Sequence, residues 1–255
     1  MASTELDERF IGQSLDPRVW FPYYLPHWSS REQSAATYVI RDGEFRLLIP
    51  PHQSLWCPDL HEEPLRVSGV QTGSFAGPVG STVGQQPFKE GLTVRQEQPT
   101  FWGYTPRFGR IEVIMRAELT ARSMFGFWLA GIEDRPERSG EILVAEVFGD
   151  EIEDGWAAVG MGIRSFRDPE LIGDFSAPRL EIDVSEPHTY AVLWNPESVE
   201  IVVDEMPVRR VDQSPGYPMQ LMIGVFDFPG RDPSGVWADH VPELVVSSVT
   251  GSPLS

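Results

Sequence analysis

The sequence predicts an all-β protein in which two antiparallel sheets pack as a jelly-roll sandwich, and three observations support this. Short apolar runs follow one another along the chain, separated by many of its 23 Gly and 23 Pro residues. No window keeps the 3.6-residue period of a helix over several turns. The 255 residues suit one large domain. Many short strands without alternating helices indicate an all-β fold, and the size favours two packed antiparallel sheets.

The expected strands are, in chain order, residues 37–41, 44–49, 65–72, 110–118, 124–130, 141–148, 156–163, 179–184, 188–194, 199–203, 207–211, 219–226 and 242–249. Turn residues stand at the joins, as in Asp42-Gly43 and Pro229-Gly230. The run 110–118 partly alternates apolar and polar residues, which is typical of a sheet packed on one face and solvated on the other.

Composition and charge exclude several classes of function. A net charge of −18, from 20 basic and 38 acidic residues, argues against binding to a nucleic acid backbone. The single cysteine, Cys57, excludes an internal disulfide, and we expect it to be a buried apolar residue. The five histidines are scattered without paired spacing, so a zinc site is not expected. No GxSxG nucleophile motif is present.

The first residues, Met1 to Leu15, are rich in charge and lack the apolar core of a secretory signal. No run approaches the roughly twenty apolar residues of a membrane-spanning helix, so no membrane partner is expected. We therefore expect a cytoplasmic protein as the sequence is written, or an extracellular one if a leader has been removed. Residues 1–36 are expected to be an N-terminal extension whose first loop and strand pack on the sandwich formed by residues 37–255.

Two glutamates five positions apart, Glu141 and Glu146, flank the apolar run of residues 142–145. In a regular strand they would point to opposite faces of the sheet. A β-bulge between them adds one residue and brings both carboxyl groups to one face. Such a pair is what retaining glycoside hydrolysis requires, with the carboxyl groups roughly 5–5.5 Å apart. Two solvated glutamates on an outward face are the alternative interpretation.

The segments around this pair carry a family resemblance. GRIEV at 109–113, FWLAG at 127–131 and EILVAE at 141–146 occur in the order found in glycoside hydrolase family 16. HTYAVLWNP at 188–196, VVD at 202–204 and PMQLM at 218–222 continue the pattern, so the resemblance spans about residues 38–249. It implies a concanavalin A-like jelly roll and an enzyme similar to laminarinases and lichenases.

By this resemblance Glu141 matches the nucleophile and Glu146 the general acid/base. Leu143 stands where the signature E-x-D-x-x-E has an aspartate, which in the family hydrogen-bonds the nucleophile. Leucine cannot do so, and its apolar bulk should raise nearby carboxyl pKa values, so we expect slower or altered chemistry. Arg164 occupies the place of a histidine that often faces the cleft. It is interpreted as a partner of the glutamates, a ligand for an anionic group, or a surface arginine.

Sugar sites need flat apolar platforms and hydrogen-bonding groups, and the predicted set is Trp102, Tyr104, Trp128, Phe148, Trp156, Phe166 and Gln220, together with Arg164. Trp194, Phe125 and Phe127 are instead expected in the core. Many family members hold a structural calcium through a late-strand aspartate. Ser247 replaces that residue here, so neither calcium nor any cofactor is predicted.

The leading hypothesis is a retaining endo-β-glycosidase that acts on a polysaccharide, with β-1,3- or β-1,3-1,4-glucan as the default substrate by resemblance. A second hypothesis keeps the fold and assigns the cleft to a small metabolite, for which Leu143, Arg164 and the absent signal argue. A third is a non-catalytic carbohydrate-binding protein, against which the retention of both glutamates counts.

Overall fold

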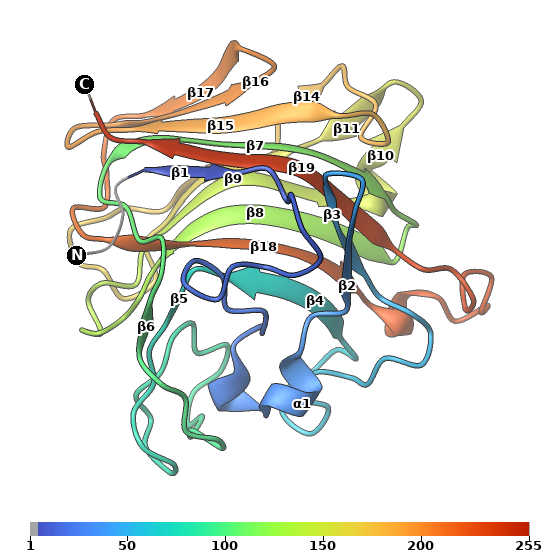
Figure 1. Cartoon of the computed structure of the whole chain (residues 1–255), viewed down its shortest axis with the longest axis horizontal. Helices are drawn as coiled ribbons and strands as arrows, with labels where there is room; N and C mark the ends of the chain where they lie inside the picture. The colour runs from blue at the N-terminus through green and yellow to red at the C-terminus, as the bar shows by residue number, and fades with distance from the viewer. Residues whose placement is uncertain (1–4, 255) are drawn as a thin grey trace.

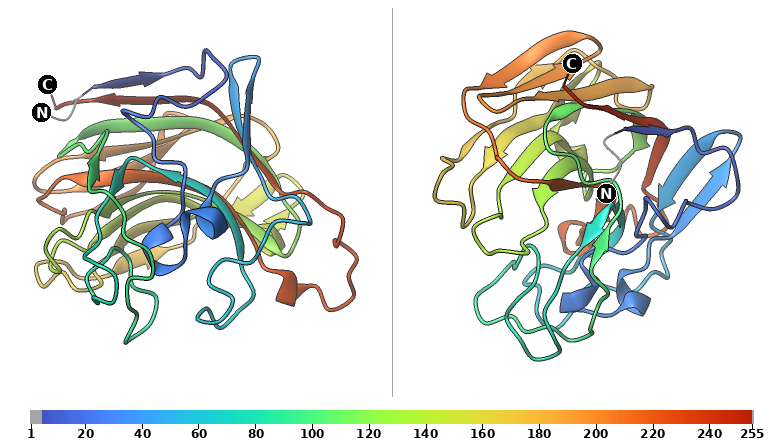
Figure 2. Two further views of the ribbon diagram at one scale, coloured as in Figure 1. Left: turned by 60° about the horizontal axis from the view of Figure 1, so that its bottom comes forward. Right: turned by 60° about the vertical axis from the view of Figure 1, so that its left-hand side comes forward.

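The computed structural model describes residues 5–254 and contains two large antiparallel sheets that lie as two layers (Figures 1 and 2). The first sheet has the spatial order β17 (Met206–Val211), β16 (Val199–Val203), β15 (His188–Trp194), β7 (Gly109–Glu118), β19 (Glu243–Ser252), β3 (Glu44–Leu48) and β2 (Tyr38–Arg41), and β1 (Leu6–Glu8) also pairs with β19. The second has the order β13 (Asp174–Ser176), β12 (Gly160–Arg164), β9 (Glu141–Phe148), β8 (Ser123–Gly131), β18 (Met219–Asp227) and β4 (Arg66–Gln71).

The remaining elements are short. β5 (Gly73–Ser74) pairs with β6 (Phe101–Trp102), and β11 (Trp156–Ala158) lies between β10 (Ile152–Glu153) and β14 (Arg179–Leu180). The helical segments are α1 (Arg31–Ser34) and the 3-10 turns η1 (Pro26–Trp28), η2 (Gly149–Glu151) and η3 (Pro229–Arg231). None of the helices in the described part of the chain is long and apolar enough to cross a membrane.

The all-β, two-sheet prediction is confirmed, and β9, β15 and β16 have the predicted bounds. The predicted run 156–163 is wrong as a single strand, because it divides at Val159 into β11 and β12, which belong to different sheets. The predicted run 179–184 shortens to β14. β5, β6, β10 and β13 were not predicted, and β1 lies within residues 1–36, where a strand was expected without bounds. Two or three residues are too few to show a period.

The main hydrophobic core lies between the two sheets. β7 alternates as expected, with Ile111, Val113 and Met115 buried and the residues between them partly exposed. Trp194, Phe125 and Phe127 are in this core, as predicted. In the predicted N-terminal extension, β1 pairs with β19 and so extends the first sheet. Residues 1–4 of this extension and residue 255 lie outside the described part of the chain.

A second hydrophobic cluster covers the outer face of the second sheet at β18 and β4. It contains Trp28, Trp56 and Cys57 from connecting segments, packed with Val67 of β4 and Phe226 of β18. The burial expected for Cys57 is confirmed. In Figure 1, α1 and the blue-to-teal loops lie beside β4 and β5. This cluster leaves β8, β9 and β12 to form the floor of a cavity, described below.

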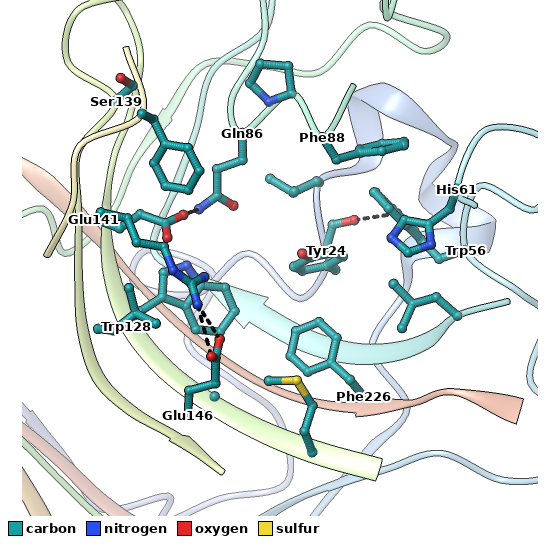
Figure 3. Close-up of a pocket in the computed structure, with 18 of the residues that line it drawn as sticks. Tyr24, Trp56, His61, Gln86, Phe88, Trp128, Ser139, Glu141, Glu146 and Phe226 are labelled. Carbon is teal, nitrogen blue, oxygen red and sulfur yellow. Dashed lines mark hydrogen bonds and ion pairs between the residues drawn. The ribbon is translucent and has the colours of Figure 1, made fainter. Parts of the chain in front are cut away.

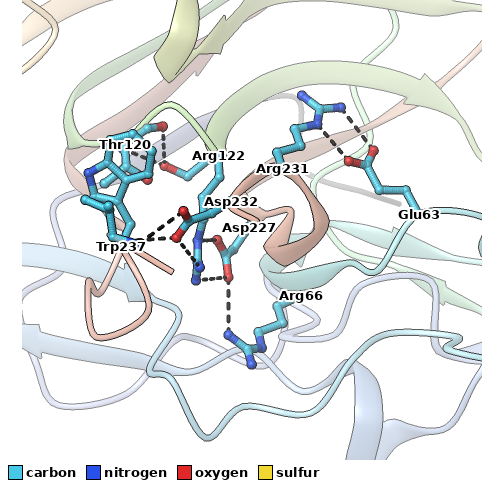
Figure 4. A network of polar contacts seen from close by, with 10 residues as sticks. Glu63, Arg66, Thr120, Arg122, Asp227, Arg231, Asp232 and Trp237 are labelled. Carbon is cyan, nitrogen blue, oxygen red and sulfur yellow. Dashed lines mark hydrogen bonds and ion pairs between the residues drawn. The ribbon is translucent and has the colours of Figure 1, made fainter. Parts of the chain in front are cut away.

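A buried ionic network closes one end of this sheet (Figure 4). Arg122 donates two hydrogen bonds to Asp227, at 2.7 and 3.0 Å, and reaches Asp232 at 3.5 Å. Asp227 is 1% exposed and also pairs with Arg66. Asp232 accepts a hydrogen bond from the backbone of Trp237. The network therefore anchors the segment that follows β18, including Phe228 at the edge of the cavity.

Candidate active site

The strand β9 carries the predicted bulge. Opposite β8, Phe127 pairs with Ala145 and Trp128 pairs with Leu143, so Val144 is the additional residue. The register against β12 shifts at the same place. Val144 points into the main core, whereas Glu141, Leu143 and Glu146 line one cavity. The bulge thus brings the two carboxyl groups to the same face, as the sequence predicted.

The cavity has a volume of about 570 Å³ and opens on the face of the second sheet that is turned away from the main core (Figure 3). β8, β9 and β12 supply its floor, and loops from both halves of the chain supply its walls. The lining includes Tyr24, Leu25, Trp56, His61, Leu65, Gln86, Pro87, Phe88, Met124, Trp128, Glu133, Ser139, Glu141, Leu143, Glu146, Arg164, Phe166, Arg167, Phe226 and Phe228.

Glu141 is 6% exposed, and its Oε1 accepts a hydrogen bond from the side-chain amide of Gln86. Burial raises the pKa of Glu141 to about 7, and the charge of Glu146 acts in the same direction. The positive charge of Arg164 and the hydrogen bond from Gln86 oppose that rise in pKa. The group can therefore change its protonation state close to neutral pH.

Glu146 forms an ion pair with Arg164, whose Nη2 lies 3.0 and 3.2 Å from the two carboxylate oxygens. Arg164 stands directly across from Glu141 in the pairing of β12 with β9. Its guanidinium carbon lies 5.0 Å from the centre of the Phe175 ring. The sequence left three interpretations open for Arg164. The structure shows the first of them, because Arg164 is the ion-pair partner of Glu146.

A third carboxyl group, Glu133, lies buried in the wall of the cavity. It forms an ion pair with Arg167 and accepts a hydrogen bond of 2.6 Å from the backbone N–H of Gln86. Glu133 thus holds the loop that presents Gln86 to Glu141. The sequence did not indicate these three supporting residues, Gln86, Glu133 and Arg167, because they lie on separate loops with no motif around them.

The structure brings five of the predicted site residues to the cavity and leaves five outside it. Glu141, Glu146, Trp128, Arg164 and Phe166 line it. The residues outside are Trp102, Tyr104, Phe148, Trp156 and Gln220. Those five residues therefore do not line the cavity, and each placement has a physical reason.

Trp102 and Trp156 lie on the short strands β6 and β11, apart from the cavity, and are 41% and 40% exposed. Tyr104 is buried in the main core. Phe148 packs against the second hydrophobic cluster and stacks on Phe228, with ring centres 6.3 Å apart. Gln220 is fully buried beneath β5. The packing there is close, because a Cβ added to Gly73 of β5 would lie 3.0 Å from the Cβ of Gln220.

The largest group that the sequence did not indicate is a row of rings facing the two glutamates. Tyr24 packs edge-on against Trp56 at 5.2 Å and against Phe226 at 5.4 Å. Phe88 contacts Trp56 at 5.0 Å and His61 at 5.5 Å. These five residues, named here the aromatic wall, come from four distant segments, so no local pattern could have identified them.

Among residues 5–254, no three His, Cys, Asp or Glu side chains are grouped so that they could hold a metal ion. The polar groups of the cavity are instead carboxyl groups, guanidinium groups, the amide of Gln86, the imidazole of His61 and the hydroxyl groups of Tyr24 and Ser139. Two facing carboxyl groups with different surroundings can divide the roles of a nucleophile and a proton donor.

Comparison with known proteins agrees with this architecture. The chain aligns with an endo-β-galactosidase from Clostridium perfringens that releases GlcNAcα1-4Gal, at a TM-score of 0.77 and 20% identity, over 96% of this chain and 61% of that one. It also aligns with the catalytic domain of a Thermotoga petrophila endo-1,3-β-glucanase, at 0.64 and 13%, over 96% and 95%. A Bacillus licheniformis β-glucanase gives 0.62 and 15%, over the full length of both chains.

The chain spans 61% of the length of the Clostridium structure. A search of curated proteins found no match. The model of glycosyl hydrolases family 16 matches residues 104–235, more than half of the chain, and this range includes the bulged strand with both glutamates. The chain therefore belongs to glycosyl hydrolases family 16.

Proposed function

We propose that the protein is a retaining endo-β-glycosidase in which Glu141 and Glu146 are the catalytic pair. The observation that carries this proposal is the bulge at Val144, which turns both carboxyl groups into one cavity. By its position in the family motif, Glu141 is the nucleophile and Glu146 the acid/base. The default substrate is a β-1,3- or β-1,3-1,4-glucan, in line with the glucanases among the structural relatives.

The reaction proceeds in two displacements. The carboxylate of Glu141 attacks the anomeric carbon, the glycosidic C–O bond breaks, and the leaving oxygen takes the proton of Glu146. Water then attacks the same carbon while Glu146 takes one of its protons, and the ester to Glu141 breaks. The sugar product keeps the β configuration, and both glutamates return to their initial protonation states.

This assignment places a requirement on Arg164. Glu146 can donate a proton only when it is protonated, and a protonated carboxyl group cannot form the ion pair with Arg164 seen in the free protein. Arg164 must therefore exchange this ion pair for at most a weaker hydrogen bond to the neutral carboxyl group before Glu146 donates its proton. Arg164 is 39% exposed at its side chain, which leaves it room to move. A released guanidinium can hydrogen-bond a sugar hydroxyl or approach Glu141.

The test is hydrolysis of a panel of polymers by purified protein. Laminarin, lichenan, agarose and arabinogalactan are incubated with the native protein and with Glu141→Gln, and new reducing ends are counted. The proposal predicts release from one β-glucan and a loss of at least about 10³-fold in the variant. Release from none of the four polymers, or release that the variant retains, would refute it. Release from agarose or arabinogalactan alone would replace the glucan by a galactan.

A small-molecule substrate is the second candidate, and the size of the cavity favours it. A volume of about 570 Å³ is in the usual range for small-ligand sites. The polymer panel separates the two functions, because an enzyme for a small metabolite would release no reducing ends from any polymer. Simple aryl β-glycosides provide the complementary assay, since they need no extended groove.

A further inference from the structure

The two sides of the cavity are lined by different kinds of side chain, and this difference affects how a glycan can enter. Glu141, Leu143 and Glu146 project from β9, and Arg164 projects from the neighbouring strand β12. Across the cavity from them stands the aromatic wall. In Figure 3 the labelled glutamates lie on one side, and Tyr24, Trp56, His61 and Phe88 lie on the other.

The aromatic wall is continuous. Each of its rings is within 6 Å of the next, from Phe88 through Trp56 and Tyr24 to Phe226. The Nε1 of Trp56 also donates a hydrogen bond of 3.1 Å to the backbone oxygen of Tyr24. Rings that touch in this way leave no gap through which a sugar chain could thread.

Behind the aromatic wall there is packed protein and no solvent. Trp56 is also a member of the second hydrophobic cluster, together with Trp28, Cys57 and Val67, all of which are almost fully buried. This cluster covers β18 and β4, the two strands over which a groove would have to continue. The aromatic wall and this cluster therefore block a glycan that lies across the sheet on the β18–β4 side. Such a glycan can extend only in the opposite direction.

We propose that the site is a blind pocket that receives one end of a glycan and cleaves it at a short, fixed distance from that end. This inference rests on the proposed function for its retaining chemistry and its catalytic pair, and it replaces the endo action by cleavage near a free chain end. An open groove would instead bind the middle of a polymer. The apolar faces of the terminal sugars would lie against the aromatic wall, because rings of this kind stack on sugars through their flat faces.

The test compares linear and cyclic glucans that contain the same β linkages. A linear oligosaccharide series, labelled at the reducing end, is digested beside a cyclic β-glucan, which has no ends. The proposal predicts one released product of constant length from every linear member, and at least about tenfold slower cleavage of the cyclic glucan. Products scattered over all internal bonds, or equal cleavage of the cyclic glucan, would overturn it.

A wall variant makes the test specific. Phe88→Ala shortens the aromatic wall on a loop that is only partly buried, and it should yield longer products and admit the cyclic glucan. Phe108→Ala is the matched control, because it removes another partly buried phenylalanine ring that lies outside the cavity, and it should leave the product pattern unchanged. An unchanged product pattern in a folded Phe88→Ala variant would count against the proposal.

Absence of hydrolysis is a separate outcome, because it refutes the proposed function and leaves the shape of the site to a binding measurement. Glu141→Gln is titrated with linear oligosaccharides of increasing length by calorimetry. Affinity that stops rising after a few sugars, together with no binding of the cyclic glucan, would support a blind pocket. Affinity that rises steadily with length, or no binding of any oligosaccharide, would overturn it.

Discussion

The side-chain amide of Gln86 donates a hydrogen bond to Glu141, a contact that joins a surface loop to a strand 55 residues further along the chain. In the family motif an aspartate two positions after the first glutamate makes such a bond, and here that position is Leu143. Gln86 therefore supplies from another part of the fold a hydrogen bond that the strand itself lacks. Unlike an aspartate, it brings no negative charge.

Replacing Gln86 tests whether it adjusts the protonation of Glu141. Gln86→Met keeps the length of the side chain and removes the amide. Since the hydrogen bond lowers the pKa of Glu141, its loss should move that pKa up by roughly half a unit to one unit. The pH profile of kcat/KM reports the shift. Gln213→Met removes a glutamine amide that bonds the backbone of Ile172, outside the cavity, and should leave the profile unchanged.

The direction of the pH dependence assigns the roles of the two glutamates. A nucleophile must be ionised, and the pKa of Glu141 is about 7. If Glu141 is the nucleophile, kcat/KM should rise as the pH increases through about 7. If Glu141 instead donates the proton, kcat/KM should fall over the same range. A fall would reverse the proposed assignment while keeping the same pair of residues.

Glu141 should also make the fold less stable as pH rises. Its pKa is raised from 4.5 to about 7 in the folded protein, so the folded state keeps a proton that the unfolded state has lost. The free energy of unfolding should therefore fall between about pH 4.5 and 7 and stay lower above that. Glu141→Gln removes this effect. The free energy of unfolding of the variant, relative to that of the native protein, should therefore be up to about 3 kcal/mol higher at pH 8 than at pH 4. Urea unfolding at both pH values measures it, with the exposed Glu205→Gln as control.

The network around Asp227 should dominate the ionic contribution to stability. Asp227→Asn leaves Arg122 buried without its main counter-charge and should cost about 3–5 kcal/mol of unfolding free energy. Glu63→Gln breaks the more exposed pair with Arg231 and should cost less than about 1 kcal/mol. Equal costs for the two variants in urea unfolding would contradict this account.

Much of the fold was predictable because strand patterns are local. The alternation in β7 and the apolar run of β9 stand in the sequence itself, and the spacing of Glu141 and Glu146 requires a bulge if the two residues are to share a face. The supporting residues of the site were not predictable. Gln86, Glu133 and the aromatic wall apart from Phe226 of β18 lie on loops that only the tertiary fold brings together, and an isolated Phe or Gln in a loop carries no pattern.

The placement of predicted residues outside the cavity has the same origin. Trp102 and Trp156 are aromatic residues on short strands, and their sequence gives no sign of whether a larger element lies beneath them. Gln220 lies on the outer face of β18, where β5 covers it. The two residues of β5 are too few to be predicted as a strand. Parity along a strand therefore identifies the face on which a residue lies. It does not reveal what packs on that face.

The central claim, that Glu141 attacks the sugar, is tested most directly by trapping the covalent intermediate. The protein is incubated with a 2-deoxy-2-fluoro β-glycosyl fluoride of the sugar it hydrolyses, and the peptides are mapped by mass spectrometry. The account predicts one sugar adduct on Glu141, absent from Glu141→Gln, together with a β-configured product. An adduct on Glu146, or a product of inverted configuration with no adduct, would contradict it.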